Sequence, residues 1–209
     1  MLKAAIFDFD GTLADTYPLT IEILRQMAAE EQWPFPDSAT IESLRSMTIR
    51  QMFKTLNVPL RRLPYLFTET RARLHDRIGE ASPYNGIAPM LEDLKNRDLK
   101  RIILSSNTQE IIDSFLQKHR MPGFDDVEGY GKLFGKGRPL KRLLKKHGAD
   151  RSSAVYIGDE VRDIDAARYA GIPVISVTWG FNTAELLARL KPDHMVDTPE
   201  ELRDLLRRL

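Results

Sequence analysis

The stretch Ala4-Ala5-Ile6-Phe7-Asp8-Phe9-Asp10-Gly11-Thr12-Leu13 decides the fold of this chain. It opens with an apolar run that predicts a short buried strand. Two carboxylates, Asp8 and Asp10, follow at the exit of that strand, and Gly11 supplies a turn. A strand with a simple Asp-Gly turn would need no function. Two acids, a glycine and a hydroxyl at one strand end are instead typical of a site for a metal and an anion.

The composition is ordinary for a soluble globular protein and excludes several function classes. The chain has 209 residues, of which 42% are apolar and 29% charged, and its net charge is +1. This balance gives no electrostatic reason to bind nucleic acid or an anionic membrane. The lack of cysteine excludes disulfides and thiolate metal sites. The sequence shows no secretory signal and no apolar run approaching roughly 18 residues, so we expect a cytoplasmic protein.

Residues 15–83 have a purely helical pattern. Leu19, Ile23 and Met27 recur at helical spacing, and Thr48 with Gln51 has the form of a capping box that opens a further helix. Prolines separate these segments, because proline cannot continue a helix. We expect no strand in this block, and we expect helices near residues 18–31, 38–45, from 48 onward and 65–78.

From residue 84 onward, short apolar runs alternate with helical patterns. This alternation predicts an α/β fold, a Rossmann-like doubly wound parallel sheet with helices on both faces. The opening strand belongs to this sheet, so we expect residues 1–14 and 84–209 to form the core and residues 15–83 an inserted all-helical domain. Further strands are expected at 101–104, 126–129, 154–157, 174–177 and 194–196, and helices near 88–97, 109–119, 139–147, 161–170, 183–190 and 199–208.

Polar residues follow other predicted strands, at the end of the sheet where ligands of parallel sheets bind. One strand runs into Ser105-Ser106-Asn107, and another into Gly158-Asp159-Glu160-Val161-Arg162-Asp163. Asp159 and Asp163 are four residues apart, which places hard oxygen ligands on one face of a first helical turn. A third strand is followed by several lysines, among them Lys132 and Lys136. Helix capping and the helix dipole are the alternative explanations for the hydroxyls and the acids.

Together these segments resemble the four motifs of the haloacid dehalogenase superfamily. The residues from Asp8 to Leu13 are similar to the first motif, D-x-D-G-T-L, in its phosphatase form. Ser106 with Asn107 resembles the second motif, and the residues from Gly158 to Asp163 resemble the fourth. Lys136 is the choice for the third motif and Lys132 the alternative, since Gly137-Arg138 separate Lys136 from a proline that commonly follows more closely. The helical insertion matches the subgroup that includes phosphoglycolate phosphatases and β-phosphoglucomutases.

The resemblance implies a role for each of these residues. Asp8 would attack phosphorus to form an aspartyl-phosphate, and Asp10 would protonate the leaving oxygen and later activate water. Mg²⁺ would be held by Asp8, by the main-chain carbonyl of Asp10 and by Asp159. Asp163 would complete the metal site or orient Lys136. The phosphoryl oxygens would be bound by Gly11, Thr12, Ser106, Asn107 and Lys136.

The expected reaction is the hydrolysis of a small phosphorylated metabolite, phosphoglycolate-like at first choice, by a monomer or homodimer. A sugar phosphomutase of the β-phosphoglucomutase type is one alternative, and a non-catalytic binding protein on the same fold is another. A dehalogenase is disfavoured, because that branch works without metal and has no need of Asp10. Specificity should lie in residues 15–83, where Arg45 or Arg50 could meet a second anionic group of the substrate. Solvated arginines at helix ends are the alternative there.

Overall fold

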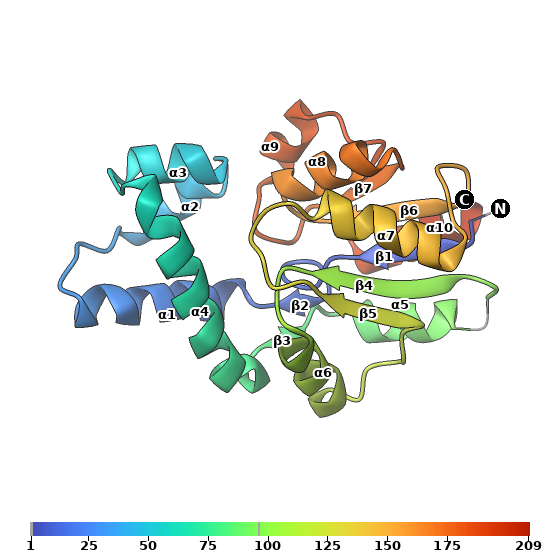
Figure 1. The fold of residues 1–209 in the computed structure, drawn as a ribbon, viewed down its shortest axis with the longest axis horizontal. Helices are drawn as coiled ribbons and strands as arrows, with labels where there is room; N and C mark the ends of the chain where they lie inside the picture. The colour runs from blue at the N-terminus through green and yellow to red at the C-terminus, as the bar shows by residue number, and fades with distance from the viewer. Residues whose placement is uncertain (1, 96) are drawn as a thin grey trace.

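Strand β1 (Ala4–Phe7) lies in the interior of a six-stranded parallel sheet in the computed structural model, which describes residues 2–95 and 97–209. The strand order is β5-β4-β1-β6-β7-β8 (Figure 1). Ala4 pairs with Lys100 on one side and with Ala154 on the other. The strands predicted from the sequence are confirmed, and so is the fold class. They are β4 (Lys100–Ser105), β5 (Asp126–Gly129), β6 (Ala154–Gly158), β7 (Val174–Val177) and β8 (His194–Val196).

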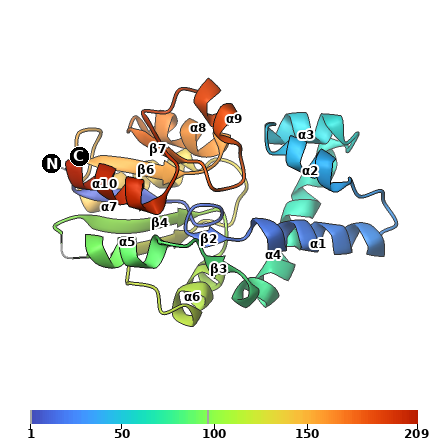
Figure 2. The same ribbon diagram turned by 180° about the vertical axis from the view of Figure 1, so that it is seen from behind.

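Helices cover both faces of this sheet (Figure 2). Ala5 and Phe7 of β1 point into one apolar cluster, and Ala4 and Ile6 point into the other, because side chains alternate along a strand. Both faces of the sheet are therefore buried, and this explains why the strands are unbroken apolar runs in the sequence. The first cluster includes side chains of α5 (Ile87–Leu94), α6 (Gln109–Lys118) and α10 (Pro199–Arg208), and the second those of α7 (Gly137–His147), α8 (Val161–Ala170) and α9 (Ala184–Arg189).

Residues 16–81, called the helical insertion below, lie to one side of the sheet (Figure 1). The α1 and α4 helices pack together through buried apolar side chains such as Ile23 and Leu74. The capping box predicted at Thr48 and Gln51 is present at the start of α3. The elements are α1 (Tyr17–Glu30), α2 (Ser38–Leu44), α3 (Ile49–Thr55), α4 (Leu63–Arg77) and the 3₁₀ turns Leu60–Arg62 and Ile78–Glu80. Within the described residues, no helix is both long and apolar enough to cross a membrane.

The expectation that residues 15–83 contain no strand is wrong at both ends of that block. Strand β2 (Ala14–Asp15) pairs antiparallel with β3 (Ser82–Pro83), where the chain leaves the core and where it returns. Strands of two residues are too short to show the alternation by which a strand is recognised in a sequence. This small ribbon holds the entry and the exit of the helical insertion side by side.

Candidate active site

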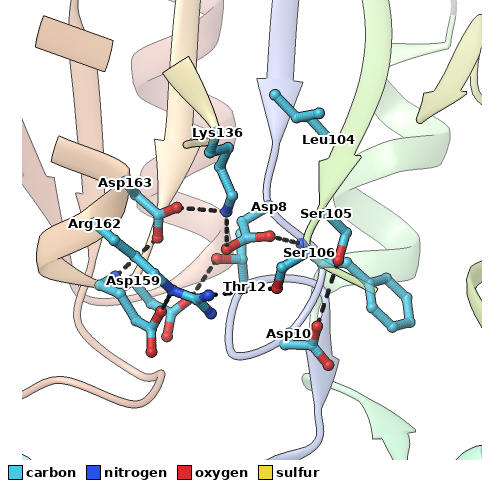
Figure 3. A network of polar contacts seen from close by, with 12 residues as sticks. Asp8, Asp10, Thr12, Leu104, Ser105, Ser106, Lys136, Asp159, Arg162 and Asp163 are labelled. Carbon is cyan, nitrogen blue, oxygen red and sulfur yellow. Dashed lines mark hydrogen bonds and ion pairs between the residues drawn. The ribbon is translucent and has the colours of Figure 1, made fainter. Parts of the chain in front are cut away.

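The carboxyl ends of four neighbouring strands bring the predicted polar residues to one edge of the sheet (Figure 3). Asp8 follows β1 directly, Ser106 follows β4, and Asp159 follows β6. Lys136 comes from the segment after β5 and stands at the start of α7. In a parallel sheet these ends share one edge, so residues far apart in the sequence meet there.

Lys136 connects Asp8 with Asp163. Its Nζ lies 2.6 Å from Oδ2 of Asp8 and 2.7 Å from Oδ1 of Asp163, and all three side chains are buried. Burial disfavours the ammonium, but the carboxylates of Asp163 and Asp8 outweigh it and raise the pKa of Lys136 well above its usual value. The other candidate, Lys132, is exposed. The geometry therefore places Lys136, and not Lys132, at the centre of the site.

Asp8, Asp159 and Asp163 form a buried cluster in which one carboxylate oxygen from each residue lies within 4.8 Å of the others. Burial raises the pKa of Asp8 to about 8, although Lys136 acts in the opposite direction. Burial, together with the charge of Glu160, also raises the pKa of Asp159. Hard oxygen ligands at this spacing fit a divalent cation, whose charge would offset the cost of keeping these carboxylates ionised.

The carboxylate of Asp159 accepts two hydrogen bonds, and the main chain passes close to it at two glycines. Thr12 Oγ1 donates to its Oδ1 at 2.7 Å, and the N–H of Phe181 donates to its Oδ2 at 2.8 Å. A Cβ on Gly11, whose φ is +72°, would lie 2.1 Å from Asp159 Oδ2, and one on Gly180 would lie 2.3 Å from the same atom. Only glycine permits this approach at either position. Thr12, which we expected at the phosphoryl group, here orients a carboxylate of this aspartate cluster.

The carboxylate of Asp10 lies outside that cluster and has its own set of donors. Thr16 Oγ1 donates to its Oδ1 at 3.0 Å, while Asn107 Nδ2 and Ser105 Oγ donate to its Oδ2 at 2.7 and 3.4 Å. Burial raises the pKa of Asp10, against the hydrogen bond from Thr16, so this carboxyl keeps a proton to higher pH than an exposed aspartate. Asn107, expected at the phosphoryl group, therefore positions Asp10 in this structure. Thr16 belongs to none of the motifs recognised in the sequence.

Ser106 faces Arg162 across the site (Figure 3). Nη1 of Arg162 lies 3.4 Å from Ser106 Oγ and 3.2 Å from the carbonyl oxygen of Leu133, and its Nε pairs with Glu160. The hydroxyl of the preceding residue, Ser105, donates to Asp10 instead. Arg162 has no role in the sequence analysis because it occupies a variable position of the fourth motif. Its place on the same helical turn as Asp163 is the signal that could have identified it.

Arg45 joins the helical insertion to the core. Its Nη2 and Nε donate to the main-chain carbonyls of Gly180 and Phe181 at 2.9 and 3.2 Å, and its guanidinium lies 5.1 Å from the centre of the Tyr17 ring. The Arg45 carbonyl in turn accepts from Asn182 Nδ2 at 3.1 Å. The sequence suggested a substrate contact for Arg45, whereas its donors here are used by the core and by Glu42.

Phe181 connects Arg45 with the aspartate cluster. The residue whose carbonyl accepts from Arg45, Phe181, donates its own N–H to Asp159. The other arginine suggested by the sequence, Arg50, is exposed at the start of α3. The position of the helical insertion is therefore linked to the geometry at Asp159 through Arg45 and not through Arg50.

Comparison with known proteins shows the family of this chain. Residues 5–177 match the family described as haloacid dehalogenase-like hydrolase. A phosphoglycolate phosphatase from Synechococcus elongatus is 32% identical over 96% of this chain and 95% of its own, and an N-acetylmuramic acid 6-phosphate phosphatase from Pseudomonas aeruginosa is 28% identical over 99% and 96%. The structure of a haloacid dehalogenase-like family protein from Streptococcus pneumoniae superposes with a TM-score of 0.80 at 24% identity, covering 98% of each chain. The chain therefore belongs to the haloacid dehalogenase-like hydrolases and is a phosphatase-type enzyme of that family, similar to phosphoglycolate phosphatases.

Proposed function

We propose that this enzyme hydrolyses small phosphomonoesters in the presence of Mg²⁺, through an aspartyl-phosphate formed on Asp8. The observation that carries the proposal is the ammonium of Lys136, held between Asp8 and Asp163, whose carboxylates cluster with that of Asp159 at the edge of the sheet. A nucleophilic carboxylate needs cations beside it before it can approach a phosphate dianion. The arrangement supplies one cation from the chain and a carboxylate cluster suited to another.

In the first step, a carboxylate oxygen of Asp8 forms a bond to phosphorus while the bond from phosphorus to the ester oxygen breaks. Asp10 gives its proton to the leaving oxygen. Its raised pKa and its donors Thr16 and Asn107 support this role, because a general acid must hold a proton at the working pH and in a fixed direction.

In the second step, water attacks phosphorus and Asp10 takes its proton, which releases orthophosphate and restores Asp8. Lys136 and the hydroxyl of Ser106 would bind the phosphoryl oxygens through both steps. Asp8, Asp159 and Asp163 would hold Mg²⁺, with the Asp10 main-chain carbonyl as a further ligand. The bound ion would supply positive charge that offsets the repulsion between Asp8 and the phosphoryl group.

We infer that the block of residues 15–83, which contains the helical insertion, is a cap domain distinct from the core formed by residues 1–14 and 84–209. Its contact through Arg45 with the loop at Gly180 and Phe181 supports closure over the edge of the sheet that carries the site. Closure would exclude bulk water and contact the organic part of the substrate. Phosphoglycolate is the first substrate to test, followed by N-acetylmuramic acid 6-phosphate, since relatives along the whole chain are named for both. We place the reaction in the cytoplasm.

The test is orthophosphate release from a panel of phosphomonoesters, measured with Mg²⁺ and with EDTA, for the wild type and for Asp8→Asn. We expect release that requires Mg²⁺ and that falls at least about 10³-fold in the variant, because an amide is no nucleophile for phosphorus. Unchanged circular dichroism of the variant would show that the fold is retained.

Two results would contradict the proposal. One is release by Asp8→Asn at the wild-type rate, which would exclude Asp8 as the nucleophile. The other is a folded wild type that binds Mg²⁺ but releases phosphate from no ester, which would favour a phosphomutase or a binding function on the same fold.

A further inference from the structure

Arg162 is a second cation in the site, and the mechanism above gives it no function. It stands in the first turn of α8, one residue before Asp163, and its guanidinium projects toward Ser106 (Figure 3). Its side chain is 20% exposed and, like Lys136, it lines a cavity of about 890 Å³. The guanidinium therefore lies close to Ser106 and is partly exposed, although neither Ser106 nor Asp8 lines this cavity.

The two cations of the site differ in how firmly they are held. Lys136 makes two short contacts, both to buried carboxylates. Arg162 has one carboxylate partner, Glu160, and its remaining contacts are to neutral oxygens at 3.2 and 3.4 Å, at or beyond the usual hydrogen-bond range. A phosphate group carries negative charge and can accept two parallel bonds from a guanidinium, and a hydroxyl or a carbonyl oxygen offers neither. An incoming phosphoryl group would thus displace the partners of Arg162 far more readily than those of Lys136.

The helix start at Arg162 does not depend on this side chain. At the beginning of α8, Asp163 Oδ2 accepts from the N–H of Glu160 at 3.0 Å, and the N–H of Asp163 donates to the main-chain carbonyl of Glu160 at 3.0 Å. The guanidinium is therefore available for a task other than holding the helix. A planar fork of donors is suited to a phosphoryl group with several equivalent oxygens.

We propose that Arg162 is a phosphate-binding residue, whose guanidinium exchanges Ser106 Oγ and the Leu133 carbonyl for oxygens of the phosphoryl group bound at Asp8. This inference rests on the proposed function, since Ser106 is placed at the phosphoryl group there. Arg162 would then act together with Ser106 and Lys136, with Glu160 fixing the orientation of its Nε.

The test measures the binding of inorganic phosphate, the expected product, by calorimetry in the presence of Mg²⁺. Arg162→Gln should raise the dissociation constant for phosphate about tenfold or more, which is the loss typical of a hydrogen bond to a charged group. With p-nitrophenyl phosphate as substrate, KM should rise by a similar factor while kcat changes less, because the contact is made in the ground state too. Arg162→Ala should recover part of its phosphate affinity when guanidinium ion is added.

Two further variants make the result specific. Arg138→Gln removes an exposed arginine from the wall of the same cavity and should leave the phosphate dissociation constant unchanged. Arg162→Lys keeps the charge without the fork and should bind phosphate between the wild type and Arg162→Gln. Thermal unfolding would show whether Arg162→Gln is folded, and Arg162→Lys provides the test if it is not.

The outcomes separate this inference from the proposed function. Equal phosphate binding by the wild type and Arg162→Gln, or no binding of phosphate by the wild type, would overturn the inference even if the enzyme hydrolyses esters. A loss confined to substrates that carry a carboxylate would also overturn it, because Arg162 would then bind that second group. Phosphate binding that depends on Arg162 in a protein without hydrolytic activity would support the inference and refute the proposed function.

Discussion

The core and the helical insertion both contain arginines and lysines paired with carboxylates, but these pairs differ in burial. The side chains of Lys136 and Asp8 are 3% and 2% exposed, whereas those of Arg73 and Glu30 in the helical insertion are 27% and 57% exposed. In a buried pair, desolvation and Coulomb attraction are both large and shift pKa values. In an exposed pair, water and salt screen the attraction.

The exposed pairs have a consistent position all the same. They join α1 to the segment around α4. Glutamates of α1 and of the residue that follows it pair with Arg62, Arg73 and Arg77. They cross the same interface that the apolar side chains of α1 and α4 fill. Ion pairs of the same chemical type therefore have different effects in the two regions. In the core they shift the pKa values of the site, whereas in the helical insertion they add little to the apolar packing.

The largest effect expected from this difference is on the pH dependence of stability without divalent metal. Asp8 has a pKa of about 8 in the folded protein and 3.8 when unfolded, so between these values the folded state keeps a proton that the unfolded chain has lost. The free energy of unfolding should therefore fall from pH 5 to pH 8, on the order of 3 kcal/mol. With Mg²⁺, which binds the ionised carboxylates, the slope should flatten. Urea titrations at each pH, with EDTA or with Mg²⁺, measure this.

Asp8→Asn is the matched control, because it removes the titrating group and should reduce the slope in EDTA. Asp163 has a lowered pKa, so its contribution is lost only as the pH falls below the usual aspartate range and does not enter this window. A free energy of unfolding that rises between pH 5 and pH 8 in EDTA would contradict the expectation.

A smaller effect is expected at the junction between the two regions. Arg45→Gln removes the donors to the carbonyls of Gly180 and Phe181, so kcat/KM should fall by about tenfold, the loss expected for a charged hydrogen bond. The affinity for Mg²⁺ should fall with it, because Phe181 also binds Asp159. Steady-state kinetics over a Mg²⁺ titration measures both.

Arg50→Gln provides the comparison within the same insertion, and it should change kcat/KM less than about twofold because Arg50 is exposed. Equal losses in Arg45→Gln and Arg50→Gln would mean that general charge on the helical insertion matters, and not the contact of Arg45 with the core.

The smallest effect is expected at Arg73, within the helical insertion. Arg73→Gln removes the exposed pairs with Glu30 and Glu69 and should lower the free energy of unfolding only slightly. The difference from the wild type should vanish in 1 M NaCl, where exposed charges are screened. Hydrolytic activity should not change. Activity that dropped with stability intact would show that this surface takes part in binding substrate.

The core could be predicted from the sequence because local rules apply there. Each strand is a short apolar run, and the polar residues that follow β1, β4 and β6 stand at strand ends, which a parallel sheet brings together. Lys136 was harder to place, because the segment after β5 holds several lysines. Only its burial between Asp8 and Asp163 distinguishes it from Lys132.

The contacts of the helical insertion could not be predicted in the same way. Its helices were recognised from periodicity, but the partners of Arg45 are main-chain carbonyls of Gly180 and Phe181, which carry no sequence signal. Their meeting depends on how the helical insertion packs on the core. Thr12 and Asn107 illustrate a related limit, since both lie in the site but turn to Asp159 and Asp10. A motif fixes the position of a residue and not the direction of its side chain.

The position of β1 also has a consequence for how the chain folds. Ala4 of this strand pairs with Lys100 and Ala154, residues that are made much later. The helical insertion, in contrast, is one continuous segment, and its helices α1 and α4 pack against each other within that segment. During synthesis its helices can form while β1 still lacks both neighbours, an apolar segment with open hydrogen-bonding edges. High sequence separation of this kind slows folding, so the formation of the sheet, and with it the site, is expected to be the late and rate-limiting event.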